Sequence, residues 1–443
     1  MASFTRRLAP AVLAAAAAVG LAGSTARADQ ASTQSEIEAL KARIAQLEAQ
    51  QSKASAAAVN DALATKAVAD VIADADRRSQ TLQAGGFMAG YTDKGFIIQS
   101  EDGAFSLHPN AQLLFRHAST MREDVKTTGG DDVQSGFEVR RMKFGLDGNL
   151  FTKDLKYFFL WATDRKSGNL VLEEAWVDYK LTDALTVRAG QYKDFFSHEA
   201  MGSSKRLFAA ERSLLNDVFT GGDNFVQGAG LIYDRGGPLR AYISYTDGAN
   251  APNQNFQDAP TNKANFGFAG RVEYKVFGDW KAYEDFTTIG NKTDTLVLGA
   301  GADYTEAGDT DTLLHTLDAQ YETGPLATYA AFLGRTVKQA GPDRYDYGFV
   351  AQAGYLINGR IEPFVRYDYI HFDQRGIASP LENDVHEITL GVNYYFKGHA
   401  AKVTADFTWL PNGSPVTNDG GDILATPAGQ NEYILRLQFQ LLI

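Results

Sequence analysis

The sequence predicts an all-β transmembrane barrel of 16 antiparallel strands, preceded by a helical coiled-coil segment on the periplasmic side. Three observations predict this fold. Apolar and polar side chains alternate strictly over residues 433–443. The same period of two, which sends successive side chains to opposite faces of a strand, recurs from about residue 105 onward. Beyond the N-terminal region, no apolar run of about 18 residues is present that could form a spanning helix.

Residues 1–28 predict a secretory signal peptide. Arg6 and Arg7 precede an apolar stretch that begins at Leu8, and Ala26 and Ala28 provide the small residues of a cleavage site. Export permits disulfides, yet the chain contains no cysteine. A closed, hydrogen-bonded barrel would hold the fold together without them.

Residues 29–52 predict a coiled-coil segment. Ile37, Leu40, Ile44 and Leu47 recur at steps of three and four residues, as the seam of a coiled coil requires. An ordinary amphipathic helix is the alternative, because the seam is shorter than the three to four heptads of an assured coiled coil. Residues 53–104 predict a partly helical linker and then, around the apolar residues 95–100, a periplasmic arm at the base of the barrel.

Residues 105–443 predict the barrel. The sixteen expected strands are 106–118, 136–147, 154–164, 170–181, 185–193, 226–235, 239–247, 265–277, 294–304, 313–323, 326–336, 346–357, 360–371, 386–396, 401–410 and 431–443. Short connections alternate with longer ones, as periplasmic turns and external loops do in such barrels. Only the segment 278–293 is unusually long for an inner turn. A soluble all-β protein of two or more sandwiches is the alternative.

The polar face of these strands should line the lumen, because an Arg or Lys facing lipid costs about 2–4 kcal/mol at the membrane midplane. This register points nine basic side chains inward: Arg141, Lys143, Arg188, Arg240, Arg271, Lys275, Arg366, Lys402 and Arg436. It also points eight acidic ones inward: Asp147, Glu174, Asp178, Glu273, Asp318, Glu362, Asp368 and Asp406. The lumen is therefore expected to be wet and of mixed charge. Cross-strand ion pairs that only rigidify the wall are the alternative role for each basic residue.

The segment 194–225 is too apolar for a solvated loop, and we expect it to fold inward and narrow the pore. Its large apolar side chains are Phe195, Phe196, Met201, Leu207, Phe208, Leu214, Leu215, Val218 and Phe219. Its polar side chains Ser203, Ser204, Lys205, Arg206 and Arg212 would then face the constriction, where cations and hydroxyls partly replace the hydration of an oxyanion. An external loop packed on a neighbouring subunit is the alternative.

No catalytic or metal-binding constellation is present in the sequence. The seven histidines lack metal-ligand spacing, and we expect no cofactor and no metal site. Glycine pairs at 228 and 230 and at 299 and 301 are interpreted as residues that ease strand curvature. The residues nearest to a barrel hydrolase are Ser197 and His198, together with His315, and an enzyme is not expected. The net charge of −12 argues against a nucleic-acid partner.

The sequence resembles the phosphate- and polyphosphate-selective porin family (porin O and P). The resemblance rests on an ordered set of motifs: Arg140-Arg141 through Gly148, Glu173-Glu174 through Tyr179, Gly190 through Lys193, Phe196, Glu199, Ser203-Ser204 and Glu211-Arg212-Ser213. It implies a trimeric 16-stranded porin whose third loop enters the pore and whose basic residues guide phosphate. Carried onto this chain, these residues are Arg141, Lys193, Ser203, Ser204, Lys205 and Arg212. The near balance of acidic and basic lumen residues departs from the strongly basic lumen of phosphate-selective members.

We therefore expect a water-filled porin in the outer membrane of a Gram-negative-type bacterium, in contact with its lipid. It should pass small hydrophilic solutes, with phosphate or other anions favoured, and assemble as a homotrimer. The candidate pore residues are Arg141, Lys143, Arg188, Lys193, Ser203, Ser204, Lys205, Arg206, Arg212, Arg240, Arg271 and Arg366. One alternative is a general or cation-tolerant porin. Another is a structural protein with a largely plugged barrel, tethered to peptidoglycan by its N-terminal segment.

Overall fold

The computed structural model describes residues 38–48, 86–92, 95–123, 133–255, 266–375, 383–418, 420–426 and 429–443. Residues 38–48 form a helix inside the predicted coiled-coil segment, and its association with other copies stays a prediction. The predicted signal peptide and most of the linker lie outside the described ranges. All other described elements belong to one compact unit, Leu82–Ile443. None of the described helices is long and apolar enough to cross a membrane.

Sixteen antiparallel strands form a closed barrel, as the alternating pattern predicts. They are β3 (Ser106–Arg122), β4 (Val133–Asn149), β5 (Leu155–Thr163), β6 (Leu170–Lys180), β7 (Leu185–Lys193), β8 (Phe225–Asp234), β9 (Leu239–Thr246), β10 (Phe266–Phe277), β11 (Thr295–Ala307), β12 (Thr310–Thr323), β13 (Leu326–Lys338), β14 (Arg344–Tyr355), β15 (Ile361–His371), β16 (Asp384–Lys397), β17 (Ala401–Leu410) and β20 (Glu432–Leu442). Each expected strand is present, with bounds shifted by a few residues.

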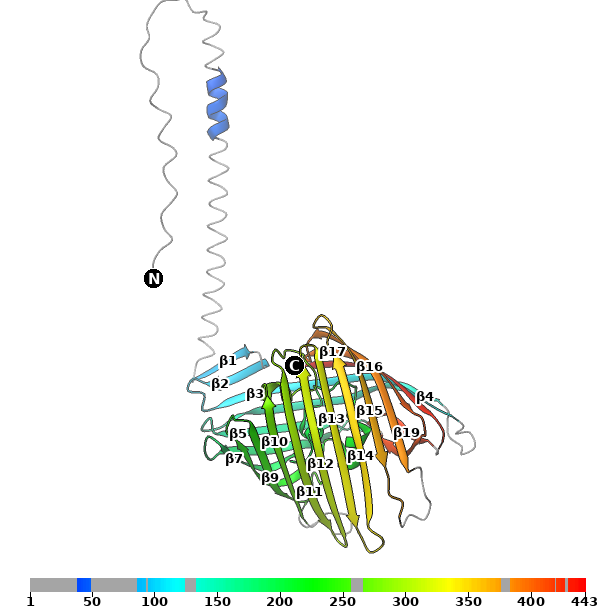
Figure 1. Cartoon of the computed structure of the whole chain (residues 1–443). Coiled ribbons are helices and arrows are strands. Elements are labelled where there is room, and N and C mark those ends of the chain that lie inside the picture. Colours follow the sequence, from blue (N-terminus) through cyan, green and yellow to red (C-terminus); the bar gives the residue numbers. More distant parts are fainter. Residues whose placement is uncertain are drawn as a thin grey trace, which may run out of the picture. The chain divides into compact units, whose positions relative to one another are not determined.

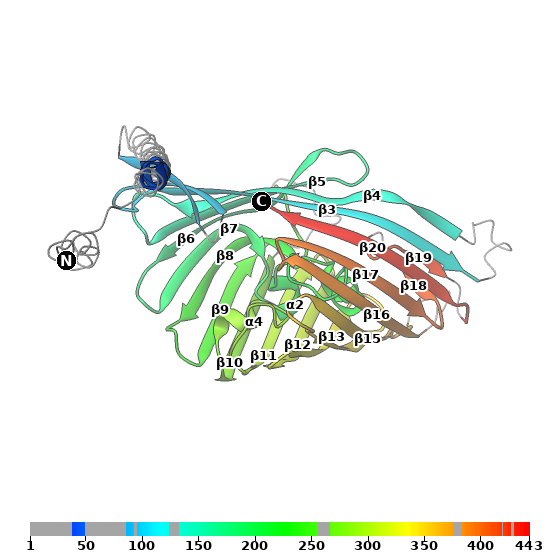
Figure 2. The same ribbon diagram turned by 90° about the horizontal axis from the view of Figure 1, so that it is seen from above.

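The barrel closes where the last strand meets the first. Strand β20 pairs with β3 over its whole length, with Phe439 opposite Phe115, and with β17 on its other edge. The backbones of Ala111 and Ile443 exchange two hydrogen bonds of 2.8 and 2.9 Å. The ring of strands that results is seen from the side in Figure 1 and from above in Figure 2. The even strand count brings the start of β3 and the chain end to one end of the barrel, which we call the short-turn end.

The two faces of the wall differ as the alternation predicts. On β20, the side chains of Leu435 and Leu437 are 56% and 54% exposed on the outer face, whereas Arg436 between them is 2% exposed and lies inside. The Arg436 guanidinium donates a 2.6 Å hydrogen bond to Asp406 on β17. The apolar outer face matches the hydrocarbon of a membrane, and the inner face keeps its charges paired.

Further elements extend the barrel at both ends. The predicted arm is a strand, β2 (Gly95–Ser100), which forms a hairpin with β1 (Phe87–Thr92) and pairs with the start of β3 through Ile98 and Leu107. The predicted loop 411–430 contains a second hairpin, β18 (Ser414–Asn418) with β19 (Ile423–Thr426). Two short helices, α2 (His198–Met201) and α3 (Leu214–Thr220), lie between β7 and β8, and α4 (Trp280–Tyr283) lies between β10 and β11.

Four register shifts interrupt the ladders of the described barrel strands, and two of these β-bulges place a charged residue at the bulge. In the β3–β4 ladder Leu114 pairs with Arg141 and Phe115 with Val139, which leaves Arg140 unpaired. In the β5–β6 ladder Leu160 pairs with Glu174 and Trp161 with Leu172, which leaves Glu173 unpaired. Because a bulge adds one residue on one strand, it lets two consecutive side chains reach the same face. The barrel thus holds two arginines and two glutamates where strict alternation would allow one of each.

The glycines at 299 and 301 lie where other groups approach the wall closely, which is a second reason for their small size beside the strand curvature expected from the sequence. A Cβ atom at Gly299 would lie 2.1 Å from the Arg271 guanidinium. One at Gly301 would lie 2.2 Å from the backbone oxygen of Phe196, in the segment between β7 and β8. Both distances are far shorter than van der Waals contact. A side chain at either position would therefore displace the Arg271 guanidinium or the backbone of Phe196.

Candidate functional site

Residues 194–224, which we call the long loop, form an ordered unit within the barrel. Ser197 caps α2 and Ser213 caps α3, each hydroxyl accepting a backbone N–H as N-cap residues do. The carboxylate of Glu199 accepts hydrogen bonds of 2.6 and 2.7 Å from the hydroxyl and backbone N–H of Ser213. The Arg212 guanidinium donates to the backbone oxygens of Glu199 and Gly202. These bonds fix the loop independently of the wall.

The apolar side of the long loop packs on the wall formed by β12–β17 and β20. Phe208 stacks on Phe364 of β15 with ring centroids 6.1 Å apart. Leu215 is fully buried in the same apolar cluster, beside Val350 and Ile370. Burying such side chains contributes roughly 1.5–3 kcal/mol each. The apolar residues that distinguish this segment in the sequence therefore bury it against a wall of the same protein.

Charged wall residues bind the backbone of the long loop. Arg366 donates to the backbone oxygen of Glu211 at 2.9 Å, and Lys402 to that of Leu207 at 2.9 Å. Asp368 and Asp406 accept the backbone N–H groups of Leu215 and Ala210. A backbone group buried without a partner would be costly. Several of the predicted inward-facing charges thus hold the loop.

Arg271 and Arg366 are enclosed by carboxylates. Arg271 is 1% exposed and donates to both oxygens of Asp318 at 2.7 and 2.8 Å, and to Glu273 at 2.8 Å. Arg366 is 2% exposed and donates to Glu387 at 2.8 Å. Both are predicted pore residues. Arg271 also donates to the backbone oxygen of Phe196 at 3.2 Å and Arg366 to that of Glu211, so both bind the long loop to the wall.

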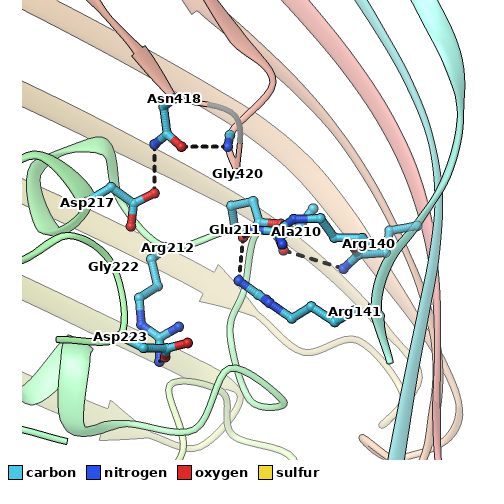
Figure 3. Close-up of polar contacts among 12 residues, drawn as sticks. Arg140, Arg141, Ala210, Glu211, Arg212, Asp217, Gly222, Asp223, Asn418 and Gly420 are labelled. Atoms are coloured by element: carbon cyan, nitrogen blue, oxygen red, sulfur yellow. Dashed lines mark hydrogen bonds and ion pairs between the residues drawn. The ribbon is translucent and has the colours of Figure 1, made fainter. Parts of the chain in front are cut away.

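An outer cavity of about 620 Å³ lies beside the long loop; its lining includes Arg140, Arg141, Glu211, Arg212 and Asp223. The Glu211 carboxylate lies between the two consecutive arginines of the β4 bulge (Figure 3), with contacts of 2.6 Å to Arg140 and 2.8 Å to Arg141. It also contacts the buried guanidinium of Arg116 on β3. Burial raises the pKa of the Glu211 carboxyl, but attraction to these three arginines outweighs burial and holds it well below its usual range.

A second carboxylate of the long loop, that of Asp223, lines the outer cavity and contacts two lysines that line a neighbouring cavity. Asp223 forms ion pairs with Arg212 at 2.7 Å and with Lys193 at 3.1 Å, and it lies 3.8 Å from Lys143. Lys143 also binds Glu173, the residue of the β6 bulge. Lys193 donates in addition to the backbone oxygen of Gly202 at 2.7 Å. Two lysines and Arg212 thus share two carboxylates across the middle of the barrel.

A narrow cavity of about 280 Å³ follows, and it brings together six of the predicted pore residues. They are Lys143, Arg188, Lys193, Ser203, Ser204 and Lys205. Glu174 is the acidic residue among its lining. Arg188 is held by both oxygens of Asp178, at 2.7 and 2.8 Å.

Lys205 differs from the other cations of the narrow cavity, because its ammonium has no acceptor among the described residues. Burial lowers its pKa, as does the nearby charge of Lys143.

A wide cavity of about 980 Å³ continues toward the short-turn end and shares Arg188, Ser203 and Lys205 with the narrow one. It also contains Arg206 and Arg240, the remaining predicted pore residues. Arg206 lies 3.8 Å from Glu284, and Arg240 is held by Asp234 at 2.8 Å.

Residues 278–294, which we call the inner segment, form one wall of the wide cavity. Figure 2 shows its helix α4 within the ring of strands. Tyr283 stacks on His198 of the long loop with centroids 3.8 Å apart, and its hydroxyl accepts from Arg271 at 2.8 Å. The backbone N–H of Phe286 donates to the backbone oxygen of Arg206. The segment expected to be only a long turn therefore meets the long loop inside the barrel.

Several residues of this arrangement, Asp223 among them, were not predicted as pore residues from the sequence. Arg116 lies on the inner face of β3, and extending the alternation of Phe115 and His117 would have found it. Arg140 and Glu173 sit at bulges, and the signal available was two consecutive like charges within an otherwise alternating strand. Glu211 carried no signal, because its partners come from β3 and β4. Within the described ranges, no group of three or more potential ligands could hold a metal ion.

Comparison with known proteins places the fold among outer-membrane porins. A family model described as phosphate-selective porin O and P matches residues 116–441. An uncharacterized protein of Aquifex aeolicus (strain VF5) is 29% identical over 265 residues, 54% of this chain and 62% of that protein. The chain thus spans somewhat less than two thirds of that relative.

Solved porin structures resemble the chain in fold. An anion-selective porin from Comamonas acidovorans matches with a TM-score of 0.54 and 16% identity, covering 76% of this chain and 100% of that one. The trimer form of OmpT from Vibrio cholerae matches with a TM-score of 0.52 and 15% identity, covering 76% of this chain and 99% of that one. OmpF of Salmonella typhi in complex with daunomycin matches with a TM-score of 0.51 and 14% identity, covering 76% of this chain and 98% of that one. At such identities the likeness concerns the fold alone.

Proposed function

The chain belongs to the phosphate-selective porin O and P family and is an outer-membrane channel, and on this premise we propose that it favours small anions, phosphate among them. Family and fold point to a channel rather than to an enzyme. The proposed path is water-filled and runs through the outer, narrow and wide cavities. Small hydrophilic solutes pass along it by diffusion.

One observation carries the proposal: Lys205 faces the narrow cavity without a partner among the described residues, beside the hydroxyls of Ser203 and Ser204. A free ammonium with hydroxyl donors can take over part of the hydration of an oxyanion. Lys143 and Lys193 add positive potential in the same cavity, although Asp223, Glu173 and Glu174 offset them. The resulting site is attractive but weak, as permeation requires.

Replacing Lys205 by glutamine is expected to weaken phosphate binding without closing the channel. Loss of one charge-assisted contact should raise the phosphate concentration that halves the chloride current by about tenfold. The measurement is single-channel recording in planar bilayers at constant chloride, with Lys292→Gln in the wide cavity as the matched control. Unchanged phosphate block in Lys205→Gln would contradict this assignment, and a cation-selective reversal potential in a KCl gradient would contradict anion preference itself. We choose Lys205 rather than Arg212 because Arg212 also holds the backbone of the long loop.

A general or cation-tolerant porin is the second candidate, and one observation favours it. The arginines of the pore are largely neutralised: Arg188 by Asp178, Arg240 by Asp234 and Arg141 by Glu211. A lumen with so many internal ion pairs has a small net field. The reversal potential of the unmodified protein distinguishes the two candidates.

The inner segment is expected to limit conductance. Replacing residues 281–290 by a short Gly-Ser turn should widen the path at the wide cavity and increase the single-channel conductance by about twofold, since resistance concentrates at constrictions. Shortening the exposed segment 340–343 provides the control. Equal conductance of the two variants would mean that the narrowest point lies elsewhere.

We propose a homotrimer in outer-membrane lipid, in line with the family resemblance and with the trimer form of OmpT, which shares the fold. The N-terminal segment is proposed to be periplasmic, where it either trimerises or binds peptidoglycan. Chemical cross-linking tests the trimer, and co-sedimentation with peptidoglycan separates the two roles of the segment. A tether with a plugged barrel would show no steady conductance.

A further inference from the structure

One wall of the narrow cavity is aromatic, although the lumen of a porin barrel is typically polar. Phe158 on β5 and Trp176 on β6 stack with ring centroids 5.4 Å apart, and both line the cavity with Phe195 of the long loop. Phe158 belongs to neither of the apolar clusters that the long loop forms with the wall. Packing of the loop therefore does not explain why this ring faces the cavity.

Among the cations that line the cavity, a single one lacks a carboxylate partner among the described residues, and the lining carboxylate, Glu174, accepts a 3.0 Å hydrogen bond from the Trp176 indole. Lys143 and Lys193 share Asp223, and Arg188 is bound by Asp178 while its guanidinium lies 3.8 Å over the Trp176 ring. Lys205 alone among these cations lacks a carboxylate within the described part of the chain. One free cation matches one negative charge better than it matches the multiple charges of a phosphate dianion.

We propose that the narrow cavity binds organic anions that combine one negatively charged group with one aromatic ring. The charged group lies at Lys205 and the hydroxyls of Ser203 and Ser204, and the ring lies against Phe158 and Trp176. The cavity volume of about 280 Å³ lies just below the usual range of roughly 300–1,000 Å³ for small-molecule pockets, so a small solute is expected. This inference rests on the proposed anion channel and names the class of solute that the narrow cavity prefers.

A pair of sulfonates tests the role of the ring, because they share the head group and stay ionised. The full-length protein is placed in planar bilayers, and block of the KCl current by benzenesulfonate is compared with block by methanesulfonate. Benzenesulfonate should block at about tenfold lower concentration, since aromatic contacts and apolar burial add to the shared charge interaction. Inorganic phosphate should block less strongly than benzenesulfonate.

Variants assign the effect to the cavity. Phe158→Leu and Trp176→Leu should each reduce the ratio between the two sulfonates at least threefold, whereas Lys205→Gln should weaken block by both. Phe349→Leu, on the outer face, is the control and should leave the ratio unchanged. Assembly of each variant is judged by its gel mobility without heating. If Trp176→Leu fails to assemble, the sulfonate ratio measured in Phe158→Leu tests the aromatic preference.

The outcomes separate the two proposals. Equal block by the two sulfonates, or an unchanged ratio in Phe158→Leu, would overturn the aromatic preference while leaving the channel intact. Absence of steady conductance, or cation selectivity, would overturn the proposed anion channel itself.

Discussion

Replacing Glu211 by glutamine is expected to make the channel markedly more anion-selective. The carboxylate binds Arg140, Arg141 and Arg116, and a neutral amide leaves the three guanidiniums without their shared counter-charge. Two charges at 4 Å interact by about 4 kcal/mol at an intermediate dielectric, and water and salt in the outer cavity reduce this. We expect about 1 kcal/mol, or about fivefold in the anion-over-cation permeability ratio.

The reversal potential in a KCl gradient measures this change. Asp183→Asn is the matched control, because it removes the same charge from a turn where the side chain is 98% exposed. Adding Arg140→Gln to Glu211→Gln should reverse part of the effect, since it removes one of the freed cations. An unchanged reversal potential in Glu211→Gln would show that ions do not pass through the outer cavity.

Replacing Arg271 by methionine is expected to give the largest loss of stability. Its guanidinium contacts Asp318 and Glu273 on the wall, Tyr283 of the inner segment and the backbone of Phe196 in the long loop. Removing one partner of a buried ion pair typically costs 3–5 kcal/mol, because the remaining charge stays buried. The long loop and the inner segment should both loosen, since this side chain joins them.

Stability is measured as the temperature at which the folded band converts to the unfolded one in gels, and by unfolding in guanidinium chloride. Arg375→Gln is the control: its side chain is 61% exposed beside Asp373, where an ion pair contributes about 0–1 kcal/mol. The double variant Arg271→Met with Asp318→Asn should recover part of the loss. If Arg271→Met were as stable as the control, the network would not stabilise the barrel.

Most of the barrel could be predicted because lipid and water impose opposite demands on successive residues. Leu435, Arg436 and Leu437 show the rule: an arginine turned toward lipid would cost several kcal/mol, so the register has one solution. The strand list and the closure of the last strand on the first both follow from this local pattern.

The candidate site could be predicted only in part. Lys205, Ser203 and Ser204 stand out locally, because a loop that carries so many apolar groups must bury them and leave its polar groups facing the open side. The bulge at Arg140 and the position of Tyr283 against His198 could not be inferred in this way. They depend on local register and on contacts between distant segments, and neither of these changes the period of apolar residues in the sequence.

The sequence by itself determined which face of each strand meets water, since side chains alternate with a period of two and lipid enforces the choice. Only the tertiary structure decided which cations remain free. Arg116 meets Glu211, 95 positions away, and Gln438, 322 positions away. Charges of both signs line the same lumen, and pairing among them depends on ångström-scale geometry. That geometry leaves Lys205 without a partner among the described residues, and so the structure distinguishes it from the other cations.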